Sequence, residues 1–360
     1  MGTFGILTFH RAINYGAALQ CYALQQAVLS LDAECEVIDY SSPRVYAANR
    51  APRKTLKSQI GWALVKRQNK ARIARFDAFM RDCVHLSVPV NSREELARTA
   101  DAYDAVIAGS DQVWNPALTD ADESYFLDFL PDGTRRRSYA ASIGERAFPP
   151  EMERHLADLL RGFGNLCVRE PGACSYLSRL TGRRVSSACD PTLLLPAEHW
   201  ARLAVGTDLQ GYVLVYSLSR VSDASFTYAK ALARSRGLDV VVVQQSPRAV
   251  PGAKRVVRDA GPREFLGLVA GADAVVSESF HGCCFALLFE RDLHWVPRAE
   301  TAGREGRITD LLGVCGLDGC RVAEGARPLD AIDWGAVRPA LEAYRGESLR
   351  ILSEEVLELA

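Results

Sequence analysis

Short apolar runs alternate with longer amphipathic stretches along most of the chain, an alternation typical of a parallel α/β fold. It begins with a strand expected over 5–9, a helix over 14–31 with apolar residues on or near one face, and a strand over 36–40. Such a βαβ unit implies parallel strands. The same rhythm predicts further strands at 104–108, 138–142, 166–168, 185–189, 212–217, 238–243, 274–276 and 293–296, and further helices at 151–163, 222–236, 262–271, from 277–282 to about 290, and at 334–359.

The rhythm pauses around 196–211, which favours a division of the chain there. We expect a first Rossmann-like domain over 1–200, a second over 201–335, and a C-terminal helix over 336–360 that packs back on the first. The predicted fold class is therefore α/β, with two Rossmann-like domains that face a cleft. Because ligands of open parallel sheets bind beyond the carboxyl ends of the strands, the loops after the strands form the candidate site.

A helical insertion over 43–98 interrupts the first domain and contains an unusually basic stretch. Between Arg44 and Arg81, nine residues are Lys or Arg and Asp77 is the only acid. The interleaved apolar residues predict one or two basic amphipathic helices. The simpler interpretation is a solvated insertion packed on the first domain. The alternative is a surface over 44–81 that contacts anionic lipid or a diphosphate-linked substrate.

The composition narrows the classes of function. Hydrophobic residues make up 48% of the 360 residues and the formal net charge is -1, so no overall charge favours nucleic acid as a partner. The 10 cysteines include no CxxC pair, so we expect no metal site. No apolar run approaches the ~18 residues of a membrane span, and no basic leader precedes the first strand. We therefore expect the chain in the cytoplasm, with the inner face of the membrane as the alternative offered by the basic insertion.

Two polar loops are the first candidates for ligand contact. The loop after the first strand offers His10, Asn14, Tyr15 and Gly16, where a glycine near a helix start brings backbone N–H groups close to an anion. As structure alone, Asn14 is a good helix cap, and the two interpretations are about equal.

The second polar loop follows the strand at 104–108. It holds Gly109, Ser110, Asp111 and Gln112, and the alternative there is an Asx-type turn covered by Trp114. Ser142, at the end of the next predicted strand, is a further candidate for substrate contact.

Two strand ends offer stronger chemistry. The planar fork of Arg169 suits a carboxylate or phosphate, unless it only pairs with Glu170 or Asp190. His281 follows an apolar strand and opens a helix, where a bound phosphate would tune it as a general acid. Around it, Glu278 could orient the ring or act as a base.

In the same order along the chain, these blocks resemble the polysaccharide pyruvyl transferase family. Glu278 stands where the family pattern leads us to expect Asp, and Cys283-Cys284 replaces small or β-branched residues. The blocks that carry the resemblance are Asn14-Tyr15-Gly16-Ala17-Ala18-Leu19-Gln20, Val37-Ile38-Asp39-Tyr40, Gly109 to Pro116, Tyr125 to Phe129, Tyr139 to Ser142, Arg169-Glu170, Asp190 to Leu195, Ser279-Phe280-His281-Gly282, and Arg307-Ile308 with Leu311-Leu312 and Gly316-Leu317.

The resemblance implies a fold similar to GT-B glycosyltransferases, with phosphoenolpyruvate as the donor substrate and no cofactor. It implies a sugar, oligosaccharide or lipid-linked glycan acceptor of a surface polysaccharide, which gains a pyruvate ketal. His281 would be the acid and Arg169 the donor anchor, with Asp111, Glu278 and His10 as candidate bases. The other residues expected at the substrate are Asn14, Tyr15, Gly16, Gly109, Ser110, Gln112, Ser142, Ser279, Gly282, Arg304 and Arg307.

Three other functions are open on the sequence. A glycosyltransferase that uses a nucleotide-sugar needs a pair of diphosphate-binding loops in the second domain, and 210–320 shows only one anion-type loop, at Ser279 to Gly282. A non-catalytic relative that binds a glycan or anion is the second. The third is the same donor chemistry on a small natural product or a peptide.

Overall fold

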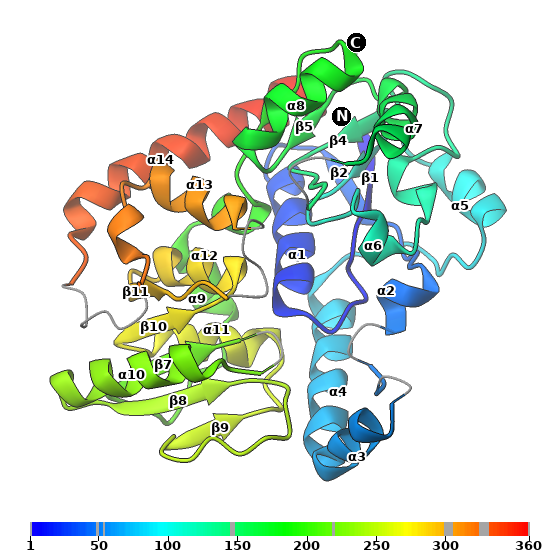
Figure 1. The fold of residues 1–360 in the computed structure, drawn as a ribbon. Coiled ribbons are helices and arrows are strands. Elements are labelled where there is room, and N and C mark those ends of the chain that lie inside the picture. Colours follow the sequence, from blue (N-terminus) through cyan, green and yellow to red (C-terminus); the bar gives the residue numbers. More distant parts are fainter. Residues whose placement is uncertain are drawn as a thin grey trace.

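A computed structural model describes residues 2–47, 50–52, 55–144, 148–217, 220–298, 305–323 and 331–358. Two parallel sheets lie side by side, each with helices packed on its faces (Figure 1). The predicted α/β fold class, with two Rossmann-like sheets that face each other, is confirmed.

The first sheet has the order β2-β1-β3-β4, with every pair parallel. Isolated bridges then join Ala141 to Asp111 on one side and to Val168 on the other, so strand pairing continues beyond β4. The strands are β1 (Thr3–Leu7), β2 (Glu34–Val37), β3 (Ala105–Ala108), β4 (Arg136–Ser138), β5 (Cys167–Val168) and β6 (Ser186–Ser187). The helices around them are α1 (Tyr15–Leu29), α5 (Arg93–Ala100), α6 (Pro116–Thr119), α7 (Pro150–Arg161) and α8 (Pro171–Thr181), with short 3-10 turns at Glu123–Phe126 and Pro191–Leu193.

The second sheet has the order β11-β10-β7-β8-β9 and is also parallel throughout. Val-rich β7 and β8 are almost wholly buried, as expected for strands covered on both faces. Its strands are β7 (Tyr212–Tyr216), β8 (Asp239–Val243), β9 (Arg255–Val257), β10 (Ala274–Ser277) and β11 (Asp292–Trp295). Its helices are α9 (Ala197–Leu203), α10 (Asp223–Arg236), α11 (Pro262–Ala270), α12 (Phe280–Leu288) and α13 (Gly306–Val314), followed by a 3-10 turn at Asp318–Cys320.

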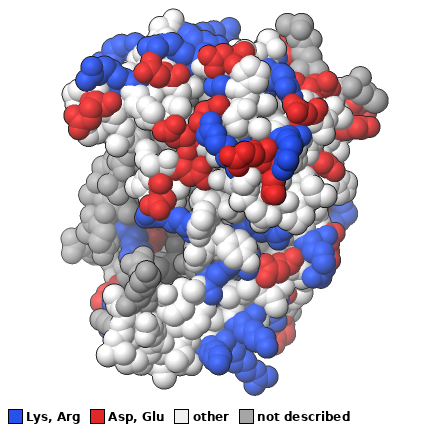
Figure 2. Space-filling view, turned by 90° about the vertical axis from the view of Figure 1, so that its right-hand side faces the viewer, with Lys and Arg blue, Asp and Glu red and all other residues white. Residues whose placement is uncertain are grey.

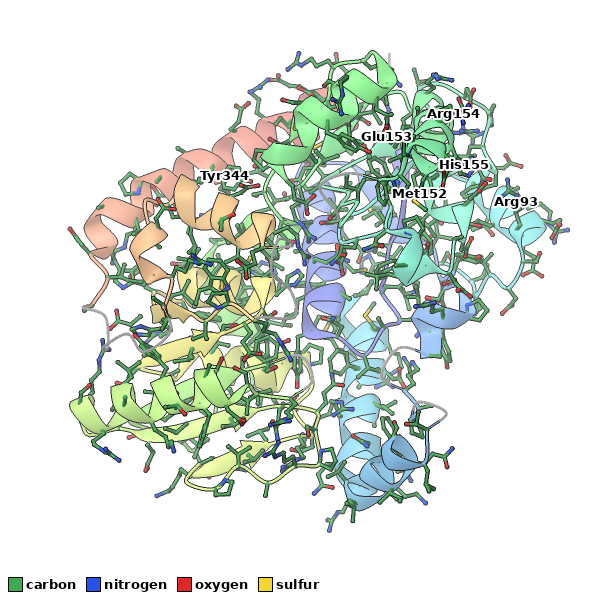
Figure 3. All side chains as sticks on the ribbon, in the orientation of Figure 1. Arg93, Met152, Glu153, Arg154, His155 and Tyr344 are labelled. Atoms are coloured by element: carbon green, nitrogen blue, oxygen red, sulfur yellow. The ribbon has the colours of Figure 1, made fainter. Side chains whose placement is uncertain are left out.

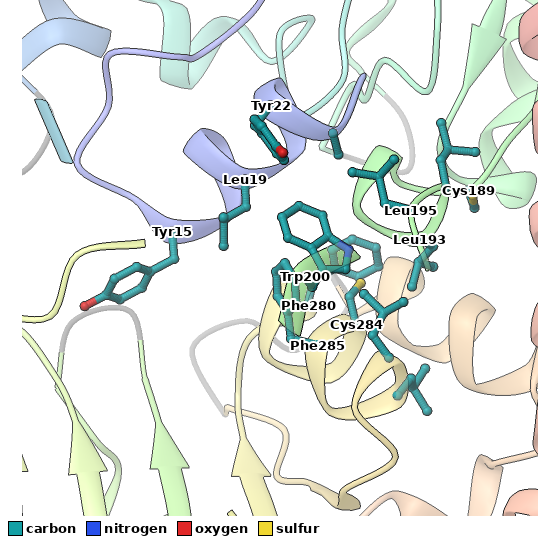
Figure 4. Packing of buried hydrophobic residues seen from close by; sticks show 14 of the residues in the cluster. Tyr15, Leu19, Tyr22, Cys189, Leu193, Leu195, Trp200, Phe280, Cys284 and Phe285 are labelled. Carbon is teal, nitrogen blue, oxygen red and sulfur yellow. The ribbon is translucent and has the colours of Figure 1, made fainter. Parts of the chain in front are cut away.

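Helix α1 is buried nearly all around rather than on the one face that its sequence spacing suggested. One side covers the first sheet, while Tyr15 stacks on Phe265 of α11 with ring centroids 4.4 Å apart. Leu19 and Tyr22 point toward Trp200 and the start of α12 (Figure 4). The apolar side chains of α1 therefore belong to one cluster that continues from the first sheet into the second.

The basic insertion forms α2 (Pro43–Ala47), α3 (Leu56–Leu64) and α4 (Lys66–Cys83). Several of its arginines face inward. Arg72 is 1% exposed and donates to the Arg258 carbonyl at 3.0 Å, and Arg75 donates to the Asp259 carbonyl at 2.6 Å. The insertion thus packs on both sheets' domains and not on the first alone.

The last helix, α14 (Trp334–Ile351), ends in a π-helical turn at Leu352–Val356. Ser348 Oγ accepts from the Cys189 N–H at 2.9 Å, and Arg137 donates to the Glu358 carbonyl at 2.7 Å. The C-terminal segment therefore contacts the strand ends of the first sheet. Of the helices in the described ranges, none is long and apolar enough to cross a bilayer.

Candidate functional site

The loops after β3, β5, β6 and β10 meet α13 around a narrow cavity. Strand pairing explains why: the bridge from Asp111 to Ala141 and the next from Ala141 to Val168 bring Asp111 close to Arg169. The cavity is lined by Arg169, Asp190, Leu193, Phe280, Arg307, Asp310, Leu311 and Tyr344. Residues from both sheets therefore contribute to one site, at the carboxyl ends of the strands.

Arg169 is at the centre of three carboxylates. Its Nη1 donates to Asp190 Oδ2 at 2.8 Å, and its Nε and Nη2 lie 3.5 Å from Glu170 Oε1 and 3.6 Å from Asp111 Oδ1. Burial alone would lower the pKa of the guanidinium, but the carboxylates outweigh burial and raise it, so Arg169 stays charged. Both ion pairs that the sequence offered as alternatives to ligand binding are present.

His281 is the second buried group, and it faces the same carboxylate. Its Nε2 lies 3.3 Å from Asp190 Oδ2, and the side chain of Asp190 is fully buried. Burial would raise the pKa of Asp190, but the charges and hydrogen bonds of His281 and Arg169 hold it well below the usual range. Asp190 thus fixes the positions of both groups, while its Oδ1 accepts from the Thr192 N–H and hydroxyl.

Two buried nitrogen atoms at this site make only long or poorly aligned contacts with carboxylates among the described residues: Arg169 Nη2, 3.6 Å from Asp111 Oδ1, and His281 Nε2, 3.3 Å from Asp190 Oδ2. A buried donor without a partner costs about 1–3 kcal/mol, so proteins rarely leave two together. The arrangement fits a ligand that carries acceptor oxygens.

Arg307 of α13 supplies a second cation. The guanidinium carbons of Arg169 and Arg307 lie 4.8 Å and 5.7 Å from the centroid of the same ring, Phe280. Burial and then the like charge of Arg169 lower the pKa of Arg307, against nearby carboxylates that raise it. With its amide oxygen turned toward Arg307, Gln112 accepts from both Nη atoms at 3.0 and 3.2 Å. An added anion between the arginines would stabilise both.

Gly16, in the first turn of α1, lies directly against the ring of His281. A Cβ atom there would come 2.0 Å from His281 Nδ1, so only glycine fits. The Gly16 N–H itself donates to Asn14 Oδ1 at 2.9 Å. The glycine therefore sets how closely α1 approaches the histidine.

We expect Gly16→Ala to lower catalytic turnover by about 100-fold, because the added methyl group displaces the His281 ring by roughly an ångström. Turnover and folding stability of the purified variant would be measured together. Gly172→Ala is the matched control: Gly172 is also in the first turn of a helix, and a Cβ there meets nothing closer than 3.9 Å. Equal turnover of the two variants would contradict the packing role of Gly16.

His10 and Tyr15, both expected to contact substrate, are engaged elsewhere. His10 Nε2 lies 2.9 Å from Asp39 Oδ1, and Nδ1 lies 3.2 Å from the Thr8 carbonyl. The Tyr15 hydroxyl donates to the Ala260 carbonyl at 2.9 Å, and burial raises its pKa. The structure places His10 within the loop after β1 and Tyr15 in the contact between α1 and α11.

Glu278 and its neighbours support the chain around His281. The carboxylate of Glu278 accepts from the hydroxyls of Ser217 and Ser225 at 2.9 and 2.6 Å, and from the Ser222 N–H at 3.1 Å. It is thus turned toward the start of α10. Ser279 is the N-cap residue of α12, and a Cβ on Gly282 would lie 2.1 Å from Ser277 Oγ, so Gly282 allows α12 to pack on β10.

The remaining predicted residues shape the helix ends and loops around the site. Asn14 caps α1, as its structural interpretation predicted. Gly109 has φ +120° with the Tyr139 carbonyl 2.4 Å from a Cβ position, a conformation that requires glycine. Ser110 donates through its hydroxyl to the Ala140 carbonyl at 2.9 Å, and the Ser142 N–H donates to the Asp111 carbonyl at 2.9 Å. Arg304 lies outside the described residues.

Two residues that the sequence reasoning did not place in the site are central to it. Asp190 joins Arg169 to His281, and the ring of Phe280 contacts the guanidinium groups of both Arg169 and Arg307. Position gave a signal for both: Asp190 directly follows a strand end, and Phe280 precedes His281. In the described ranges, no group of three or more His, Cys, Asp or Glu residues could hold a metal ion.

Comparison with known proteins adds one informative match. The family model described as polysaccharide pyruvyl transferase matches residues 14–296. No curated protein matches the chain.

Several solved glycosyltransferase structures align over nearly the full length. Spinosyn forosaminyltransferase SpnP is 12% identical with a TM-score of 0.45, and the alignment covers 98% of this chain and 95% of that one. The glycosyltransferase SsfS6 of Streptomyces sp. SF2575 is 14% identical with a TM-score of 0.41, at 98% and 100% coverage. An α-glucosyltransferase in complex with UDP is 8% identical with a TM-score of 0.49, at 98% and 96% coverage.

Proposed function

Because this chain belongs to the polysaccharide pyruvyl transferase family, we propose that it transfers the pyruvyl group of phosphoenolpyruvate to two hydroxyl groups of a sugar acceptor. The acceptor is a surface polysaccharide or its sugar, oligosaccharide or lipid-linked precursor, and inorganic phosphate is released. The observation that supports this donor best is the pair of buried nitrogen atoms that lack a well-formed hydrogen bond, Arg169 Nη2 and His281 Nε2, beside the second cation Arg307.

The donor fits the charges of the cavity. Phosphoenolpyruvate carries a carboxylate and a phosphate, and the two guanidinium groups that contact the Phe280 ring and line the cavity can each bind one of them. An anion near Arg307 would offset the like charge of Arg169, which now lowers the pKa of Arg307. Arg169 is held by carboxylates before the ligand arrives, so it needs no reorganisation to bind.

The reaction consists of two additions at the same carbon. His281 gives a proton to the methylene carbon, and one sugar hydroxyl attacks the neighbouring carbon, C2, and loses its own proton. The C2–O bond to phosphate then breaks, and the second hydroxyl attacks C2 and closes the ketal ring. One hydroxyl proton replaces that given by His281 and the other leaves with phosphate, so the atoms balance.

Asp111 is the base that the geometry favours. It lies at the same edge of the first sheet as Arg169, and its Oδ1 is 3.6 Å from Arg169 Nη2 and accepts from the Gln112 N–H at 2.9 Å, so Oδ2 would take the proton. The carboxylate of Glu278 already accepts three hydrogen bonds at the start of α10, and both ring nitrogens of His10 have partners. We therefore assign Glu278 and His10 to support of the two loops and Asp111 to the hydroxyl proton.

Titration calorimetry with phosphoenolpyruvate tests the donor. We expect the wild type to bind and Arg307→Gln to raise the Kd by about 10- to 100-fold, because one charge-assisted contact is lost. Arg179→Gln is the matched control: Arg179 is exposed, and its guanidinium carbon lies at the same 5.7 Å from the Tyr176 ring as that of Arg307 from Phe280. Binding of UDP-glucose with no heat from phosphoenolpyruvate would replace this donor with a nucleotide-sugar.

A further inference from the structure

One face of helix α3 exposes a continuous apolar stripe. Leu56, Ile60 and Leu64 are 73%, 54% and 74% exposed, and they follow one another at intervals of four residues. Side chains at this spacing lie on the same side of a helix. Single exposed apolar residues are common on proteins, but three large ones in register on one short helix indicate contact with a partner.

The opposite face of α3 is already attached to the molecule. A Cβ on Gly61 would lie 3.1 Å from Pro247, in the loop between β8 and β9, and Trp62 is partly buried. Val65, between α3 and α4, is buried as well. The helix is thus held in place with the stripe outward.

Basic residues continue directly from the stripe. Lys66, Arg67 and Lys70, at the start of α4, are exposed, whereas Arg50 pairs with Asp77 and Arg72 is buried. Figure 2 shows Lys and Arg side chains gathered at the lower end of the face that α3 and the start of α4 occupy. Three exposed cations of the insertion therefore lie where the apolar stripe ends.

We propose that this surface, Leu56, Ile60 and Leu64 together with Lys66, Arg67 and Lys70, docks the protein on a bilayer rich in anionic phospholipid. The leucine and isoleucine side chains enter the boundary between headgroups and acyl chains, and the cations contact the headgroup phosphates. A second copy of this chain fits less well in a parallel two-fold contact between the stripes, because that contact would bring the same three cations close to each other, and self-association in an antiparallel contact is an outcome of the test below.

The basic insertion is joined to the loop after β1 by hydrogen bonds. Arg50, between α2 and α3, donates to the Arg11 carbonyl in the loop after β1, at 3.3 Å from Nε and 3.2 Å from Nη2. The basic insertion is thus held against the loop after β1 as well as against the second domain. This inference goes beyond the donor chemistry and does not depend on it.

Sedimentation with lipid vesicles tests the surface on the full chain. We expect binding to vesicles that contain phosphatidylglycerol but not to phosphatidylcholine alone, and release at high salt. The triple variant Leu56→Ser, Ile60→Ser and Leu64→Ser should lower the partition coefficient on the order of tenfold or more. Lys66→Gln, Arg67→Gln and Lys70→Gln together should lower it about tenfold, with the loss confined to anionic vesicles.

Val88→Ser is the control, because Val88 is as exposed as Leu56, at 73%, and lies outside α3. Circular dichroism and phosphoenolpyruvate binding would confirm that each variant is folded. Equal binding of wild type and both triple variants, or no binding to anionic vesicles, would overturn the proposal. A concentration-dependent dimer that the serine variant abolishes would overturn it in favour of self-association.

Discussion

Replacing His281 with glutamine is expected to lower kcat for pyruvyl transfer by about a thousandfold, within the usual ~10²–10⁴ range for loss of a general acid. Glutamine keeps a hydrogen-bond donor beside Asp190 and a similar volume against Gly16, but it cannot give a proton to carbon. The Kd for phosphoenolpyruvate should therefore change by less than about tenfold, since Arg169 and Arg307 are still present. Phosphate release with a sugar acceptor gives kcat, and calorimetry gives Kd.

His155→Gln is the control for this substitution. His155 is an exposed residue of α7 and pairs with Glu123 at 2.7 Å, and Figure 3 shows it well separated from Tyr344 on α14, which lines the cavity. It should keep wild-type kcat. A His281→Gln enzyme that turns over at a tenth of the wild-type rate or faster would remove His281 from the acid role, and equal losses in kcat and donor affinity would make it a binding residue.

The largest expected effect on stability comes from Arg169→Met. Methionine removes the buried ion-pair partner that Asp190, Asp111 and Glu170 share, so the free energy of unfolding should fall by about 3–5 kcal/mol at neutral pH. Urea unfolding of wild type and variant measures the difference. Arg350→Met is the control, because Arg350 is exposed and its pairs with Glu347 and Glu354 should contribute little to stability.

The pH dependence separates this loss from a simple packing defect. The folded-state pKa of Asp190 is lowered, so its contribution is present above the unfolded pKa of about 4 and is lost as pH falls through the folded value. Without Arg169 that folded pKa rises. The difference between wild type and variant should therefore shrink as the medium becomes acidic, and a difference that stays constant down to the acid transition would contradict the charge argument.

The strand-end rule explains why much of the site could be predicted. Arg169, His281 and Asp111 each lie in the first few residues after an apolar strand, and parallel strands bring such positions to one edge of a sheet. The polar loop after the strand at 104–108 offered Gln112, and the blocks shared with the family added Arg307. Their contact joins that loop to the start of α13, about two hundred residues further along the sequence. Spacing and residue type were sufficient to predict these positions, because the ends of the parallel strands place them in the site.

The direction in which each side chain points could not be predicted from the sequence. His10 and Tyr15 are in the right loop but turn toward Asp39 and Ala260, because only tertiary packing decides which way each points. The strand expected at 138–142 is instead β4 at Arg136–Ser138, since buried Arg136 and Arg137 find carbonyl acceptors at Leu130 and Glu358 that no periodicity shows. The boundary near residue 200 and the other domain limits stay predictions.

The burial of α1 on all sides limits how this protein can admit its substrates. A wide separation of the two sheets would expose Tyr15, Leu19 and Phe265 to water, at about 25 cal/mol for each Å² of apolar surface. Few ligands could compensate for that. We therefore expect a ligand to enter through local shifts of the segments around the cavity rather than through a wide hinge motion of the two sheets.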